Sequence, residues 1–333
     1  MLLRVCRLAL VGAGLLLETA RGVPAKCEAG TAAAKQGLSA VQVRSMKERR
    51  VDSSDDAGNA ALGEERARPH EMWVPRRGGG SLALAKVSLN EDLSSIHLGG
   101  SGQLHSQVGQ DWLVASLLGC KRGGFFLDLA ANDAVKYSNS LMLERDFGWE
   151  GICVEANPAY RKGLLARRCR YVAAAVGSPT GTKVEFVFKG VFGGIKSDAT
   201  DIHRAGGSPK RTMYTVSLQD LLKSLGAPRT IDYFSLDVEG AESMVMKDFP
   251  WEEYTFSVLT VERPKPDLAE ALRAHGYRML RVNSRFNDQT WIHEGSWKDL
   301  ALLSSQWGNG ANSTASSCMA SAHGLAWPSA LQT

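Results

Sequence analysis

The middle of the chain, residues 101–300, alternates short apolar strands with short helical segments, and this rhythm constrains the fold more than any other feature. Apolar runs occupy residues 125–129, 151–155, 231–237 and 256–261, and helical patterns follow them. Runs that are apolar throughout are typical of parallel strands covered on both faces. The sequence therefore predicts an α/β domain with a doubly wound, mostly parallel sheet.

Two segments interrupt this rhythm after a strand predicted over residues 170–176. One is residues 183–188, and the other is the glycine-rich stretch 190–209. The length of 333 residues alone suggests two domains. Because the rhythm resumes after the interruption, we expect one domain over residues 101–300 instead, with residues 190–209 as a mobile insertion over the ligand-binding face of its sheet.

The N-terminal segment resembles a targeting peptide. Arg4 and Arg7 precede a compact apolar run at residues 8–17, and small residues follow at 23–25. This order predicts a secretory signal peptide over residues 1–25, and hence the secretory pathway. The Ala- and Ser-rich stretch behind it leaves a plastid or other organelle transit peptide open as the alternative. The run is too short for a membrane span, and no other segment is a candidate for one.

The segments that flank the domain lack a lasting apolar period. Residues 26–100 predict a disordered stem, and residues 301–333, which carry no Asp, Glu, Lys or Arg, predict a disordered tail. Residues 1–100 hold 14 basic and 11 acidic side chains, whereas the rest of the chain holds 25 and 24. The expected domain is thus close to neutral, which excludes the concentrated cationic face of a nucleic-acid-binding protein.

The six cysteines fit neither a zinc site nor a disulfide framework. They lack C-x-x-C spacing, and they are few for a chain of this length. Cys153 lies within an apolar strand, and its position predicts a small buried core residue. A bridge between Cys120 and Cys169 is left open.

Acidic residues end the predicted strands one after another. Asp128, Glu155, Asp237 with Glu239, and Glu262 stand at four successive strand ends. Ligands of open α/β sheets bind outside the carboxyl ends of the strands. We therefore expect these acids to surround a ligand site.

Glu155 stands in the position of an acid that accepts hydrogen bonds from the two ribose hydroxyls of an adenosine. This arrangement serves NAD and S-adenosylmethionine equally. An NAD-dependent oxidoreductase should also carry G-x-G-x-x-G after the first strand, and residues 128–134 do not supply it.

Eight blocks of sequence, taken in order, form a pattern typical of one protein family: residues 106–111, 126–133, 137–140, 143–144, 148–151, 155–158, 231–242 and 261–264. Together they resemble the FkbM-type methyltransferase family from Ser106 to His293. The resemblance implies a Rossmann-like, seven-stranded methyltransferase sheet with S-adenosylmethionine as methyl donor. It also implies that the methyl group is transferred to an oxygen of a sugar, a glycan or a small metabolite. Neither the identity of this acceptor nor the oligomeric state follows from the resemblance.

The resemblance also assigns the donor-binding residues. They are Asp128, Ala130, Asn132, Glu155 and Asn157. For proton removal from the acceptor hydroxyl, the candidates are Asp237, Glu239 and Glu262, because crowded carboxylates raise one another's pKa toward a useful value for a base. His105 and His293 are alternative bases, and oxygen ligation of a divalent cation by the three acids is an alternative role. No metal is assigned.

The chain departs from the family at two glycines of the donor loop. Where the family has Asp-x-Gly-Ala-x-x-Gly, this chain has Ala130 and Ala134. Glycine at such positions allows a positive φ and a close approach to the cofactor, so an alanine is tolerated readily only where φ stays negative. A catalytically silent binding or trafficking module on the same fold is therefore the alternative function.

Overall fold

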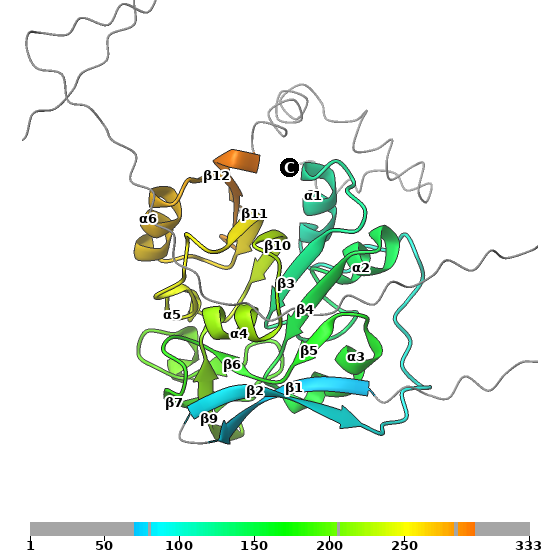
Figure 1. Ribbon diagram of the computed structural model, residues 1–333, viewed down its shortest axis with the longest axis vertical. Coiled ribbons are helices and arrows are strands. Elements are labelled where there is room, and N and C mark those ends of the chain that lie inside the picture. The colour runs from blue at the N-terminus through cyan, green and yellow to red at the C-terminus, as the bar shows by residue number, and fades with distance from the viewer. Residues whose placement is uncertain (1–69, 79–80, 205–206, 283–285, 297–333) are drawn as a thin grey trace, which may run out of the picture. The chain divides into compact units, whose positions relative to one another are not determined.

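The computed structural model describes four stretches of the chain: residues 70–78, 81–204, 207–282 and 286–296. The leader expected over residues 1–25 and the tail expected over 301–333 lie outside these stretches. Within them the chain forms two sheets and two layers of helices (Figure 1).

The main sheet has nine strands within the described part of the chain. In spatial order they are β12 (Tyr277–Val282), β13 (Gln289–His293), β11 (Thr255–Val261), β10 (Thr230–Leu236), β3 (Phe125–Leu129), β4 (Glu150–Val154), β5 (Arg170–Val172), β1 (His70–Gly78) and β2 (Ser81–Leu89). The six strands from β11 to β1 are mutually parallel, and β13, β12 and β2 run antiparallel to their neighbours. The α/β class is confirmed, but the sheet is mixed and nine-stranded rather than seven-stranded.

The hairpin of β1 and β2 accounts for the two additional strands. It lies inside residues 26–100, so the expectation of a disordered stem is wrong for His70–Gly78 and Ser81–Leu89. Trp73, Leu82 and Leu84 pack against the core, and β1 pairs in parallel with β5. The apolar residues of β2 alternate with polar and small ones, and an isolated two-stranded hairpin is stable only when it pairs with a further strand.

The second sheet has the order β6 (Ala175–Val176), β9 (Lys210–Val216), β7 (Lys183–Val187) and β8 (Gly194–Ile195). Of its four strands, β8 lies inside the segment 190–209 that was expected to be a mobile insertion, and β7 and β9 flank that segment. The strand predicted over residues 170–176 is also divided, because the chain leaves the main sheet after Val172 and enters the second sheet at Ala175. Ala173 marks the change by donating its N–H to the carbonyl of Trp73 at 2.8 Å.

The helices cover both faces of the main sheet (Figure 1). One layer contains α1 (Gln110–Leu117), α2 (Leu141–Phe147) and α3 (Arg161–Ala166), and the short helix η1 (Pro158–Tyr160) precedes α3. The other layer contains α4 (Leu218–Ser224), α5 (Glu242–Met246) and α6 (Pro266–Ala274). The further short helix η2 (Asp201–Arg204) lies in the insertion. No helix among the described residues has the length and apolarity to cross a membrane.

The two layers produce two apolar clusters, one on each side of the sheet. Along β3, Leu127 and Leu129 face the cluster that contains α4, α5 and α6. Phe126 faces the cluster that contains α1, α2 and α3. Burial on both sides explains why the central strands are apolar throughout, and it confirms the doubly wound arrangement.

Cys153 is bonded to Cys169, with Cα atoms 5.9 Å apart. Cys153 is therefore not the simple core thiol that the sequence suggests, and the bridge from Cys169 to Cys120 is not the one formed. The bond joins β4 to the segment between α3 and β5.

Candidate active site

An open pocket of about 570 Å³, a volume that includes its mouth, lies at the carboxyl ends of β3, β4 and β10. Its lining includes five residues singled out from the sequence: Ala130, Asn132, Glu155, Asn157 and Asp237. Two strand ends that are 82 residues apart in sequence, at Glu155 and Asp237, thus contribute carboxylates to one pocket. This is the arrangement expected for a ligand site of an open α/β sheet.

The opposite wall of the pocket comes from the second sheet. Phe186 of β7 and Ile195 of β8 line it, together with Gly190 and Val191 from the segment that joins these strands. The glycine-rich insertion therefore borders the site, as predicted. Phe186 was not predicted, because the five residues of β7 alternate in a pattern that fits any half-buried strand.

Glu155 organises the two loops on its side of the pocket. Its carboxylate accepts the backbone N–H of Asn132 at 3.0 Å and that of Asn157 at 2.6 Å. The side chain is only 6% exposed, and burial raises the pKa of Glu155 to about 7. Each carboxylate oxygen has a second lone pair, so the group can still accept two hydroxyl donors from a ligand.

The loop after β3 has a conformation that its residues seldom adopt. Ala130 has φ 60° and Asn132 has φ 55°, both in the left-handed region that favours glycine. The condition under which alanine is readily tolerated, a negative φ, is not met at Ala130. The Asn132 side-chain oxygen is buried and has no hydrogen-bond partner, although the residue lines the pocket. A buried acceptor of this kind fits a donor group on a bound ligand.

Ala134, the second alanine of this loop, is in a different situation. Its φ is not positive, it is 4% exposed, and it does not line the pocket. A Cβ at Gly163 would lie 2.9 Å from the Cβ of Ala134. Glycine at position 163 in α3 therefore leaves the space that the methyl group of Ala134 occupies.

Asp128 lies outside the pocket lining, unlike the other predicted donor-binding residues. It is buried below the loop, and its carboxylate accepts a short hydrogen bond from the hydroxyl of Ser140. Burial raises the pKa of Asp128, whereas the bond from Ser140 and the charge of Arg167 lower it. Asp128 can thus reach a ligand only through the loop that follows it.

The three predicted catalytic acids meet beside the pocket. Asp237, Glu239 and Glu262 each offer one carboxylate oxygen, and these atoms lie within 4.8 Å of one another. Burial and the nearby charge of Glu262 raise the pKa of Asp237 well above its usual value and that of Glu239 to about 7. Of the three, Asp237 lines the pocket itself.

Arg263 supplies positive charge to this acidic cluster. Its guanidinium lies 3.3 Å from Glu239 and 3.0 Å from Asp201, and it makes a shorter contact with Glu262. Asp201 belongs to η2, and its N–H donates to the carbonyl of Glu239 at 3.0 Å. The insertion is thus attached to the acidic side of the site.

The two histidines considered as alternative bases, and the nearby Glu242, lie outside the pocket lining. His105 contacts Arg145 at 3.1 Å, and burial lowers the pKa of His105. His293 packs edge-on against Tyr277. Glu242 accepts the N–H groups of Val238 and Gly240, both at 3.1 Å, and so stabilises the turn that carries Glu239.

The chain matches one known family model over part of its length. The model of the methyltransferase FkbM domain matches residues 128–279, which confirms the family resemblance. These residues run from Asp128 at β3 to Met279 in β12 and so include the pocket and the acidic cluster. No curated protein matches the chain.

Two solved structures are distantly similar. The precorrin-6y C5,15-methyltransferase of Geobacter metallireducens is 13% identical, with a TM-score of 0.29 over 55% of this chain and 85% of that one. The 1,6-didemethyltoxoflavin-N1-methyltransferase of Burkholderia thailandensis, solved with 1,6-didemethyltoxoflavin and S-adenosylhomocysteine, is 12% identical, with a TM-score of 0.27 over 55% of this chain and 76% of that one.

Proposed function

We propose that this chain is a methyltransferase that uses S-adenosylmethionine to methylate a hydroxyl oxygen of a sugar or small metabolite, and the match of residues 128–279 to the model of the methyltransferase FkbM domain supports this proposal. The observation that carries the proposal is the single pocket lined by Glu155 and Asp237. One carboxylate suits the ribose of the donor, and the other suits the proton of the acceptor.

The donor side of the pocket fits an adenosine bearing an amino acid. Glu155 retains lone pairs for the two ribose hydroxyls while its bonds to the N–H groups of Asn132 and Asn157 keep it in place. The unpartnered side-chain oxygen of Asn132 is an acceptor for an ammonium group. Phe186 and Ile195 offer an apolar wall. When bound, S-adenosylmethionine supplies an activated methyl group on a good leaving group.

The acidic side of the pocket provides the base. A carboxylate oxygen of Asp237 accepts the proton of the acceptor hydroxyl, and Glu239 and Glu262 maintain the high pKa that makes Asp237 basic enough. Positioning the hydroxyl beside the methyl group supplies much of the remaining rate. We favour proton removal over cation ligation, because the guanidinium of Arg263 already pairs with Glu239 and Glu262.

We further propose that the protein acts in the secretory pathway. The bond between Cys153 and Cys169 supports this proposal, because disulfides persist mainly in oxidising compartments. Detection of the protein in the culture medium or the Golgi lumen after tagging would agree with the proposal. Import into a plastid or another organelle would contradict it.

The donor proposal is tested by calorimetric titration of Glu155→Ala with S-adenosylmethionine. Loss of two hydrogen bonds to a charged acceptor predicts binding weaker by about 100-fold. Glu150→Ala is the matched control, because Glu150 lies at the other end of β4 with an exposed side chain and should leave affinity unchanged. Unaltered affinity in Glu155→Ala would refute this placement of the ribose.

The catalytic proposal is tested by screening glycans and small hydroxylated metabolites with a labelled donor. Once an acceptor is found, Asp237→Asn should abolish transfer and keep donor affinity, and a chelator should have no effect. Activity that a chelator removes and Mg²⁺ restores would favour the cation role instead.

The catalytically silent alternative rests on Ala130. Its left-handed φ and its place in the pocket lining mean that its methyl group occupies space where the donor approaches. A protein that binds the donor but methylates no acceptor, or binds no donor at all, would favour this alternative.

A further inference from the structure

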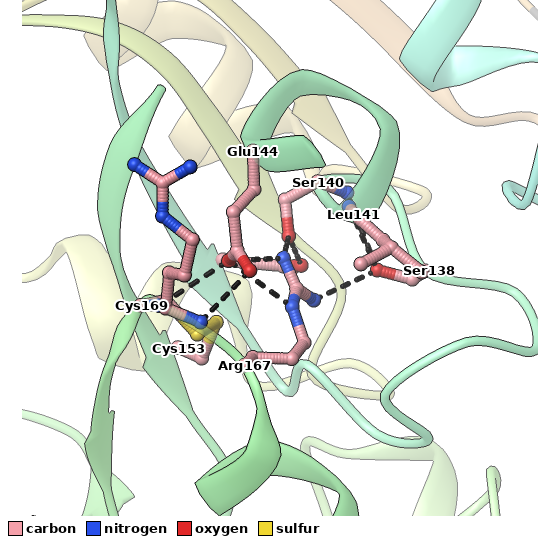
Figure 2. The surroundings of a disulfide bond; sticks show 9 residues. Ser138, Ser140, Leu141, Glu144, Cys153, Arg167 and Cys169 are labelled. Carbon is pink, nitrogen blue, oxygen red and sulfur yellow. Dashed lines mark hydrogen bonds and ion pairs between the residues drawn. A yellow bond between two sulfur atoms is a disulfide. The ribbon is translucent and has the colours of Figure 1, made fainter. Parts of the chain in front are cut away.

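A buried ion pair joins Glu144 of α2 to Arg167 at the end of α3, close to the disulfide (Figure 2). The Arg167 guanidinium and the Glu144 carboxylate are 3.0 Å apart, with side chains only 0% and 3% exposed. Glu144 also accepts the N–H groups of Arg168 at 2.8 Å and Cys169 at 3.2 Å. Charges this deeply buried are costly unless every hydrogen-bonding group is used, and the guanidinium has further N–H groups to satisfy.

Arg167 also donates to two serines at the start of α2 (Figure 2). One guanidinium nitrogen donates to Ser138 at 3.0 Å, and another donates to Ser140 at 3.1 Å. The hydroxyl of Ser140 in turn contacts the Asp128 carboxylate. A guanidinium can only donate and an ionised carboxylate can only accept. The Ser140 hydroxyl therefore accepts a hydrogen bond from Arg167 and donates its own proton to Asp128. Arg167 therefore acts on Asp128 through Ser140.

The segment that carries Arg167 is attached covalently to the strand next to Asp128. Cys169, two residues after Arg167, is bonded to Cys153 of β4. Cys153 is the direct neighbour of Asp128 in the parallel register of β3 and β4. The disulfide and the ion pair thus fix Arg167 relative to the end of β3.

The same serine segment also contacts the other strand that carries the site. The side-chain amide of Asn139 donates to the hydroxyl of Ser235 at 3.0 Å. Ser235 pairs with Asp128 in the register of β3 and β10 and precedes Asp237 by two residues. Residues 138–140 therefore connect the end of β3, before the donor loop, with the end of β10, before the base.

We propose that Arg167 is a positioning residue: through Ser140 it fixes Asp128 and thereby the left-handed loop of Ala130–Asn132 against Glu155. This inference rests on the proposed function for its effect on the methyl donor, because Arg167 and Ser140 themselves do not line the pocket. Its effect on the loop needs no donor.

The test compares two buried serines that each accept one hydrogen bond from Arg167. Ser140→Ala removes the link to Asp128. Ser138→Ala removes the other serine acceptor of Arg167, which also accepts the N–H of Leu141 at 3.1 Å, and does not remove the Ser140 hydroxyl that contacts Asp128. Both variants should unfold more easily than the wild type. Only Ser140→Ala should weaken binding of S-adenosylmethionine, by about tenfold, as expected for one lost hydrogen bond to a charged group. Equal affinities in the two variants would overturn the proposal.

Hydrogen exchange at the amide of Asn132 gives a second readout that needs no ligand. This amide donates to Glu155 in the positioned loop, so its exchange should accelerate in Ser140→Ala and stay at the wild-type rate in Ser138→Ala. Equal acceleration of exchange at the Asn132 amide in both variants would show that Arg167 has only a structural role. If the wild type fails to bind the donor while the exchange rates differ as expected, the proposed function fails and the positioning role stands.

Discussion

Replacing Ala130 by glycine should improve the donor site, and this prediction comes from one backbone angle. Ala130 has φ 60° and lines the pocket at the position where the family has glycine. The substitution changes two things. It relieves the contact of a Cβ with its own backbone, and it removes a methyl group from the pocket.

The two effects have different magnitudes. An L-residue in the left-handed region costs about 1 kcal/mol or slightly more, whereas glycine adds unfolded-state entropy worth about 0.4–1 kcal/mol. The free energy of unfolding of Ala130→Gly should therefore rise by less than about 1 kcal/mol. A methyl group that crowds a ligand costs at least about 1 kcal/mol, so affinity for S-adenosylmethionine should improve by about tenfold.

Ala134→Gly is the matched control in the same loop. Ala134 is buried with a φ that is not positive, and it packs against Gly163. The change removes a buried methyl group worth about 0.8 kcal/mol and adds unfolded-state entropy. It should lower the free energy of unfolding by about 1–2 kcal/mol and leave donor affinity unchanged.

Urea denaturation and calorimetric titration of the two variants measure both quantities. The reasoning is refuted if Ala130→Gly binds the donor no more tightly than the wild type. It is also refuted if Ala134→Gly gains as much affinity, because the gain would then come from general loosening of the loop.

Three further predictions concern pH and redox state. Burial raises the pKa of Glu155 to about 7. Because the ionised form accepts the ribose hydroxyls, affinity for S-adenosylmethionine should increase as pH rises through about 7. An affinity that stays constant between pH values of about 6 and 8 would contradict this role. Burial raises the pKa of Glu242 from 4.5 to about 7. Since the folded protein then binds this proton more tightly than the unfolded chain, stability is greatest below the unfolded pKa and is lost as pH rises through about 7, and thermal unfolding of Glu242→Gln should depend less on pH than that of the wild type. Reduction of the Cys153–Cys169 bond, which closes a loop with a sequence separation of 16, should lower the free energy of unfolding by about 3 kcal/mol, and an unchanged urea midpoint in dithiothreitol would show that the bond does not contribute.

The central strands and the acids at their ends were accessible from the sequence because local patterns encode them. Continuous apolar runs predict strands that are covered on both faces. The parallel arrangement then brings Glu155 and Asp237 to one edge, as found in the pocket. The exception is Asp128, whose buried side chain contacts Ser140 at the start of α2 and does not line the pocket. The sequence position alone does not reveal which strand-end acid faces the ligand.

Other features depend on pairings between distant segments, which local patterns do not encode. The hairpin of β1 and β2 is stabilised by pairing with β5, about a hundred residues later in the chain. The second sheet forms because β7 pairs with β9 across the insertion. The buried bonds of Arg167 also escape prediction, because an arginine near the end of a helix is usually exposed. Only the packing of α2 against the sheet encloses Arg167 with Glu144.

Titration of the wild-type protein with S-adenosylmethionine tests the central claim most directly. We expect saturable binding at one site, with competitive displacement by S-adenosylhomocysteine and an affinity that Glu155→Ala lowers by about 100-fold. No heat and no thermal shift at millimolar donor, with the protein folded, would contradict the claim that this pocket binds the methyl donor.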